Sequence, residues 1–226
     1  MQRSRAKEEL RRAVEQVLED TDARERIDEQ KKVAKERRER ADTLWFELIL
    51  SMATLGKSQG SVLATDDDYY SKVRYHQLPD MEEAERTDRL EEVLLDAGVR
   101  FPNKKARYIS THVDRIEEMG GLESAQEEFE YMDGEEKKMQ FLKGFKGIGD
   151  KYSRNIGMDL YHPDFRNTVA VDTRIGNVTA ELEIDFNSYE REEEFYVSVA
   201  EQLSMTPWEL DRTLYRYTDE VINEIP

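Results

Sequence analysis

Residues 141–177, FLKGFKGIGDKYSRNIGMDLYHPDFRNTVAVDTRIGN, hold the local pattern from which the fold can be predicted. Two helical patterns flank Gly147-Ile148-Gly149, so this triplet predicts a tight hairpin that a side chain at either glycine would obstruct. The N–H groups at the start of the second helix would suit a phosphate oxygen. An otherwise acidic chain gathers four basic residues around this turn: Lys143, Lys146, Lys151 and Arg154. The pattern indicates a phosphate-binding hairpin, and a plain corner between two helices is the alternative interpretation.

Helical patterns also dominate the rest of the chain. Residues 43–55 are apolar nearly all round, which predicts a buried central helix. Thr206-Pro207 predicts an N-cap followed by Pro in the first helical position. Further helices are expected over 4–19, 22–43, 80–97, 103–118, 122–132, 135–145, 151–160, 172–182, 190–203 and from 207 to about 223. The short β-branched segment TVAV, 168–171, belongs to no alternating series of strands, so we predict an all-α protein.

Charge and composition limit the class of protein. The chain has 226 residues with 51 Asp+Glu and 34 Lys+Arg, a net charge of −17, and a pI near 4.7. Such acidity normally disfavours nucleic acid, but it also keeps proteins soluble at high salt, and we favour this halophilic interpretation. The absence of cysteine excludes disulfides, a Cys nucleophile and a Cys-bound iron–sulfur cluster. We expect a cytoplasmic protein, a monomer, with no membrane segment and no metal held by side chains.

The region after the hairpin resembles a known superfamily. Gly147, Gly149, Lys151 and Asp172 fall on the positions of a Gly/Pro-rich loop, a lysine and a catalytic Asp in the endonuclease III-like helix–hairpin–helix DNA glycosylases. The closest likeness is to the 8-oxoguanine DNA glycosylase/AP lyases, because Lys105-Ala106-Arg107-Tyr108 is similar to a segment of theirs. The chain departs from the pattern at Lys146 in place of Pro, at Arg174 in place of His, and in a longer spacing before Asp172.

The resemblance implies two helical lobes with a cleft between them. A six-helix lobe with the hairpin would cover 44–165, and residues 1–43 and 166–226 would form the second lobe. Lys151 would be the nucleophile, forming a Schiff base with the sugar. Asp172 would stabilise the positive charge that develops on the sugar, although it could equally be only a helix N-cap.

The resemblance also suggests how DNA would be held. Gly147, Gly149, Lys146 and Lys143 would bind phosphates, with a monovalent cation bridging hairpin carbonyls to one of them. Lys105 would contact the partner base, and Asn155 would line the base pocket. Gln59 would contact the partner base from the loop after the buried helix, although it could simply be exposed.

Together these features predict a base-excision-repair DNA glycosylase with AP-lyase activity that removes an oxidised base, 8-oxoguanine being favoured. Its partner would be double-stranded DNA containing a damaged base, and it would need no iron–sulfur cluster or other cofactor beyond the cation. Two alternatives remain open at this point. One is a pyrimidine-lesion or mismatch glycosylase of endonuclease III type, and the other is a non-catalytic helix–hairpin–helix DNA-binding protein.

Overall fold

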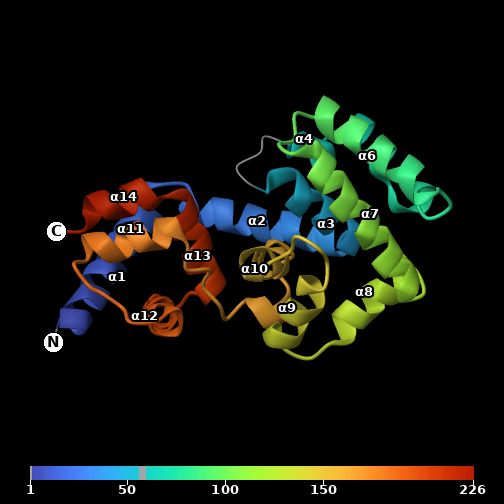
Figure 1. Ribbon diagram of the computed structural model, residues 1–226. Coiled ribbons are helices and arrows are strands. Elements are labelled where there is room, and N and C mark those ends of the chain that lie inside the picture. The colour runs from blue at the N-terminus through green and yellow to red at the C-terminus, as the bar shows by residue number, and fades with distance from the viewer. Residues whose placement is uncertain (1, 56–59) are drawn as a thin grey trace. The chain divides into compact units, whose positions relative to one another are not determined.

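The computed structural model describes residues 2–55 and 60–226. These residues form helices joined by loops and contain no β-strand, which confirms the predicted all-α class (Figure 1). No helix in the described chain is both long enough and apolar enough to cross a membrane. The chain divides into two compact units, Arg37–Gly157 and Met1–Glu36 with Met158–Pro226. The divisions fall inside the last turns of helices α2 and α10, several residues before the expected boundaries at 43/44 and 165/166.

The unit Arg37–Gly157 is built around α3 (Thr43–Thr54), whose side chains are buried on nearly every face. The Trp45 indole N–H in α3 donates to the Val73 carbonyl at 2.8 Å. The other helices are α4 (Val62–Thr65), α5 (Asp67–Tyr70), η1 (Ser71–Val73), η2 (Tyr75–Gln77), α6 (Glu83–Asp96), α7 (Pro102–Glu118), α8 (Leu122–Tyr131), α9 (Glu135–Lys143) and α10 (Asp150–Asp159). The apolar character of 43–55 therefore produces the predicted central helix.

A buried lysine fixes the end of α8. The fully buried Lys138 of α9 donates from its ammonium to the carbonyls of Phe129 at 2.7 Å, Glu130 at 3.0 Å and Met132. These carbonyls lie at the C-terminal end of α8, where intrahelical donors run out and a cation is favoured by the helix dipole. The contact ties α8 to α9, the first helix of the hairpin.

The second unit joins the two ends of the described chain. It contains α1 (Gln2–Asp20), α2 (Ala23–Arg38), η3 (Pro163–Phe165), α11 (Thr173–Glu181), α12 (Tyr189–Gln202), α13 (Pro207–Arg216) and α14 (Thr218–Glu224). Helix α1 packs against α14 and α12, and α11 packs against α14 and α13 (Figure 1). The apolar stripe of α1, with Leu10, Val14 and Leu18 buried, supplies its side of this core.

The predicted start of α13 is confirmed in detail. Thr206 Oγ1 accepts from Glu209 N–H at 3.2 Å, and Glu209 Oε2 accepts from Thr206 N–H at 2.6 Å, with Pro207 in the first helical position. This reciprocal capping box satisfies two N–H groups that a helix otherwise leaves without partners. Glu209 also forms an ion pair with Lys31 of α2, so the cap fixes α13 to α2.

Candidate active site

Helices α9 and α10 are joined by a turn over residues 144–149. Within it, Phe145 N–H donates to Leu142 O and Ile148 N–H donates to Phe145 O, both at 3.0 Å. The side chains of Phe145 and Ile148 are buried and hold the turn against the core of its unit. The predicted helix–hairpin–helix is therefore present. Two short-range hydrogen bonds and the buried side chains of Phe145 and Ile148 fix the path of its turn.

The two glycines of the hairpin have different roles in the fold. Gly147 has a φ of +91°, and a Cβ there would lie 2.7 Å from Cδ2 of Tyr108. At Gly149, a Cβ would meet no atom of the described chain within 4 Å. The sequence predicted obstruction at both positions, but within the chain only Gly147 is constrained. The N–H groups of both glycines donate to no acceptor in the described residues. The N–H of Gly149 is therefore available to a ligand that enters the open space beside this residue.

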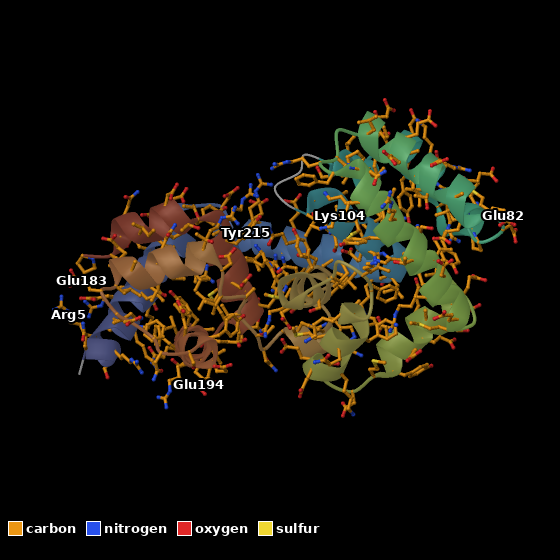
Figure 2. All side chains as sticks on the ribbon, viewed as in Figure 1. Arg5, Glu82, Lys104, Glu183, Glu194 and Tyr215 are labelled. Atoms are coloured by element: carbon orange, nitrogen blue, oxygen red, sulfur yellow. The ribbon has the colours of Figure 1, made fainter. Side chains whose placement is uncertain are left out.

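Two lysines lie near Tyr108, the residue of α7 that contacts the hairpin at Gly147. Lys104 lies on α7, where Figure 2 labels it. Its ammonium group and that of Lys146 in the hairpin each lie 5.4 Å from the centre of the Tyr108 ring. Beneath them, Nε2 of the buried His112 lies 2.9 Å from the Lys146 carbonyl oxygen. Burial lowers the pKa of His112 to about 4, so the ring is neutral and donates Nε2–H to this carbonyl. This group therefore combines positive charge with an aromatic surface.

Lys151 is the second residue of α10 and is exposed. Its ammonium forms no hydrogen bond or ion pair with any residue that the structure describes. Lys143, in contrast, pairs with Asp150 at 2.8 Å and lowers the pKa of that carboxyl. Asn155, one turn beyond Lys151, is half-buried, and its amide makes no hydrogen bond within the described chain. Lys151 and Asn155 are therefore available to a ligand, whereas much of the Lys143 charge is compensated.

Lys105 is placed differently from the expected DNA contact. Its side chain is only 2% exposed, and its ammonium donates to the Leu55 carbonyl at the end of α3 at 2.8 Å. Burial, reinforced by the nearby charge of Arg100, lowers the pKa of Lys105 to about 8. The side chain thus joins α7 to the end of α3 and offers little surface to DNA. Gln59 lies outside the described residues.

Phe101 is a candidate that the sequence analysis did not select. It precedes α7 in a left-handed conformation, with φ 57° and ψ 51°, and 63% of its side chain is exposed. The Arg100 guanidinium lies 5.4 Å from its ring centre. A bulky residue in the left-handed region has a disfavoured backbone conformation, and such conformations cluster at functional sites. The signal in the sequence was an aromatic residue directly between Arg100 and Pro102.

Asp172 precedes α11 and serves as its N-cap. Its Oδ1 accepts from the N–H groups of Arg174 at 2.9 Å and Ile175 at 3.3 Å. Its Oδ2 accepts no hydrogen bond from the part of the chain that the structure describes. The carboxylate is half-buried, so one oxygen is fixed by the helix while the other can face a positive charge.

The nearby carboxyl of Asp211 was also missed from the sequence. Asp211 lies on α13 between the buried residues Trp208 and Leu214, each three positions away, and is only 5% exposed. An acidic residue on the apolar face of a predicted amphipathic helix was the signal that could have found it. Its Oδ1 accepts from the Ala170 N–H at 2.8 Å, two residues before Asp172.

The described residues contain no group of three or more His, Cys, Asp or Glu side chains that could hold a metal ion. For the monovalent cation implied at the hairpin, the ligands would be backbone carbonyls. Two of these already accept hydrogen bonds, Phe145 O from Ile148 N–H and Lys146 O from His112. Each carbonyl oxygen has a second lone pair, so the hairpin remains compatible with a cation that also binds a phosphate.

The helical arrangement of the described residues, with its helix–hairpin–helix, matches solved structures of DNA glycosylases over most of the chain. The 8-oxoguanine DNA glycosylase of Thermotoga maritima matches with a TM-score of 0.67 and 20% identity, over 93% of this chain and 96% of that one. The 8-oxoguanine DNA glycosylase of Methanocaldococcus jannaschii matches with a TM-score of 0.65 and 19% identity, over 92% of each chain.

The glycosylase/lyase of Methanocaldococcus jannaschii in complex with 15mer DNA containing 8-oxoguanine matches with a TM-score of 0.64 and 18% identity, over 93% of this chain and 97% of that one. No family model matches the chain, and no curated protein matches it by sequence. The chain therefore has the fold of 8-oxoguanine DNA glycosylases over nearly its whole length. Lys151 belongs to the unit Arg37–Gly157 and Asp172 to the other unit, so their meeting in one site stays a prediction.

Proposed function

We propose that this protein is a DNA glycosylase with AP-lyase activity that removes an oxidised base, 8-oxoguanine being favoured, from double-stranded DNA. The observation that supports this most strongly is Lys151, an exposed lysine without a partner in the described chain, at the start of the second helix of the hairpin. The fold that this chain shares with 8-oxoguanine DNA glycosylases is the second support for the proposal.

The hairpin would hold one strand of the DNA. The N–H of Gly149 donates to a phosphate oxygen in the space that lacks a side chain, and the start of α10 adds the positive end of its dipole. Lys146 and Lys104 provide positive charge near the Tyr108 ring. We retain a monovalent cation as a further part of this contact and assign no step of the reaction to it.

The damaged base must leave the duplex before the sugar can react. Phe101 is suited to fill the space that the base leaves, because its ring is exposed and lies next to Arg100. The cost of unstacking is about a few kcal/mol per step, and an inserted aromatic ring recovers part of it by stacking. Asn155 would then contact the extruded base.

The chemistry follows from the two catalytic residues. The neutral Lys151 amine attacks C1′ as the bond to the base breaks, and the base leaves with the electron pair and takes up a proton. The Asp172 carboxylate stabilises the positive charge on the sugar during this step. The amine nitrogen and C1′ then form a Schiff base as the sugar ring opens. Loss of a C2′ proton expels the 3′ phosphate and cuts the strand.

A panel of duplexes tests this function. Each duplex carries one lesion, 8-oxoguanine, an oxidised pyrimidine, a mismatch or an abasic site, and is assayed with the intact protein from low to molar salt. Strand cutting with and without alkali separates base excision from lyase activity, and borohydride traps a Schiff base. We expect excision of 8-oxoguanine with cutting in the absence of alkali. Excision of pyrimidine lesions or mismatches alone would favour the endonuclease III type, and binding without excision or trapping would identify a non-catalytic DNA-binding protein.

A further inference from the structure

The extended segment Thr168–Val171 has no strand beside it in the described chain, and helix side chains bind its backbone. Glu193 of α12 accepts from both the Thr168 hydroxyl and the Val169 N–H, the latter at 3.1 Å. Tyr189, at the start of α12, donates its hydroxyl to the Val169 carbonyl at 3.2 Å and accepts from the Val171 N–H at 3.2 Å. Side chains thus replace the neighbouring strand that an extended segment normally requires.

Asp211 completes this arrangement from α13. Its Oδ1 accepts from the Ala170 N–H at 2.8 Å, so the three consecutive N–H groups from Val169 to Val171 all donate to side chains. We call Tyr189, Glu193 and Asp211 the backbone clamp. The residue that follows the clamped segment is Asp172, whose backbone orientation depends on the conformation of Val171.

Asp211 is also close enough to Asp172 for their charges to interact. Burial raises the pKa of Asp211 to about 6, Arg212 opposes this rise, and the negative charges of Asp172 and Asp159 add to it. The Arg212 guanidinium lies near Asp211 and Asp159, with Nε 3.6 Å from Asp211 Oδ2 and Nη1 3.2 Å from Asp159 Oδ1. A carboxyl with this pKa changes charge just below neutral pH, next to the proposed catalytic carboxylate.

We propose that Asp211, assisted by Tyr189 and Glu193, is a positioning residue for Asp172, acting through the Ala170 N–H and through its own negative charge. This inference rests on the proposed function for its catalytic consequence, whereas the structural relationship between the two carboxylates stands independently. When Asp211 is ionised, it adds to the negative potential around Asp172 and favours positive charge on the sugar. When Asp211 is protonated, its charge is lost and only its hydrogen bond with the Ala170 N–H remains.

The first experiment measures this relationship without any DNA. Carboxyl carbon NMR shifts follow the titration of Asp211 in the intact wild-type protein and in Asp172→Asn. Because the Asp172 charge contributes to the raised pKa of Asp211, the pKa of Asp211 should fall in Asp172→Asn. The exposed Asp219→Asn on α14 is the matched control and should leave it unchanged. An Asp211 pKa that is the same in Asp172→Asn and wild type would overturn the charge interaction.

The second experiment measures single-turnover excision and DNA binding across the pKa of Asp211. Asp211→Ala removes both the acceptor and the charge, and should slow excision at least about tenfold with DNA affinity unchanged, a modest part of the effect of a removed catalytic charge interaction. Asp211→Asn retains an acceptor for Ala170 N–H and should recover the part of this loss that comes from the hydrogen bond. Wild-type excision should fall more steeply than that of Asp211→Asn as the pH drops through about 6, because only the wild type loses the Asp211 charge.

Tyr189→Phe is a second test that keeps the ring and removes the hydroxyl that makes both backbone hydrogen bonds. It should slow excision by about a few fold, since a displaced catalytic group loses rate without losing substrate affinity. Wild-type rates in Asp211→Ala and Tyr189→Phe would overturn the positioning role.

If Asp211→Ala does not fold, the pH profile of Asp211→Asn and the excision rate of Tyr189→Phe test the positioning role instead. If wild type itself excises no base, the proposed function fails, and NMR still decides the relationship between the carboxylates.

Discussion

The ring of Tyr108 occupies the position beside Gly147 that a Cβ would need, with Cδ2 only 2.7 Å from that point. Helix α7 therefore selects glycine in the hairpin, and the positive φ of Gly147 adds a second reason. Gly149, two residues later, is under neither constraint in the described chain. This contrast separates a structural glycine from one whose open space a ligand could use.

Replacing these glycines should give opposite results. Gly147→Ala should lower the free energy of unfolding by about 1–3 kcal/mol, because the backbone is strained and Tyr108 must move. Gly149→Val should cost less than about 1 kcal/mol but weaken duplex binding, because its side chain blocks the approach of a phosphate. Denaturant unfolding and fluorescence anisotropy measure the two effects. If Gly149→Val folds and binds DNA as wild type does, the phosphate contact is not at this hairpin.

Lys151→Gln should abolish borohydride trapping on abasic and lesion-containing DNA while leaving binding nearly intact. Glutamine keeps much of the side-chain length, but it has no amine to form a Schiff base. Lys137→Gln, an exposed lysine on α9, should trap as efficiently as wild type. Gel separation of the covalent complex gives the result, and trapping that persists in Lys151→Gln would assign the nucleophile to another amine.

Asp172→Asn should separate catalysis from helix capping. Asn is as good an N-cap as Asp, so the free energy of unfolding should hardly change. Excision should fall by about 10²-fold or more, because the charge that stabilises the sugar cation is lost. Asp172→Ala should lose stability as well, by about 1 kcal/mol. Single-turnover excision and thermal unfolding compare the three proteins, and normal excision by Asp172→Asn would leave this carboxylate with only its capping role.

Phe101→Ala should slow excision from duplex DNA by about tenfold, the effect of losing roughly 1–3 kcal/mol of base–aromatic stacking. Excision from a single strand should change little, because no stacked neighbour has to be replaced there. Leu95→Ala, which also removes an exposed apolar side chain, 65% exposed, is the matched control. Equal losses on duplex and single strand would show that Phe101 acts on something other than base extrusion.

Lys105 should make stability depend on pH. Its pKa is lowered from 10.5 to about 8 in the folded protein, so between these values the unfolded chain binds more protons. The free energy of unfolding should therefore gain a contribution as the pH rises from about 8 to about 10, and lose it as the pH falls through about 8. Lys105→Met should lack this gain, and Lys104→Met should retain it. Denaturant unfolding near pH 7.5 and pH 9.5 provides the comparison.

The helices and the hairpin could be predicted because their signals are local. Thr206-Pro207 with Glu209 encodes its capping box within four consecutive residues, and the glycines of the hairpin lie between two clear helical periods. The paired glycines Gly120 and Gly121, with φ of +91° and +98°, lie between the helices that the sequence predicts over 103–118 and 122–132. In these places a few neighbouring residues determine the backbone.

The arrangement around the candidate site depends on residues far apart in the chain, and this part could not be predicted. Whether Lys105 faces solvent or the Leu55 carbonyl depends on how α7 packs against α3. The TVAV segment can be recognised in the sequence by its β-branched residues. The sequence does not indicate that Tyr189, Glu193 and Asp211 bind the backbone of this segment. The place of Asp211 on the apolar face of α13 signals that it is buried, but not that its carboxylate accepts from the Ala170 N–H. Such contacts emerge only from the tertiary fold.

The packing of α1 against α14 has a consequence for the order in which the protein is made. Helix α1 leaves the ribosome before α14, and the entire unit Arg37–Gly157 is synthesised between them. That unit is one uninterrupted stretch and can begin to fold during translation, while α1 still exposes Leu10, Val14 and Leu18. At about 5–20 residues per second this wait lasts on the order of ten seconds. The high charge of α1, with its Arg and Glu pairs, would keep the waiting helix in solution.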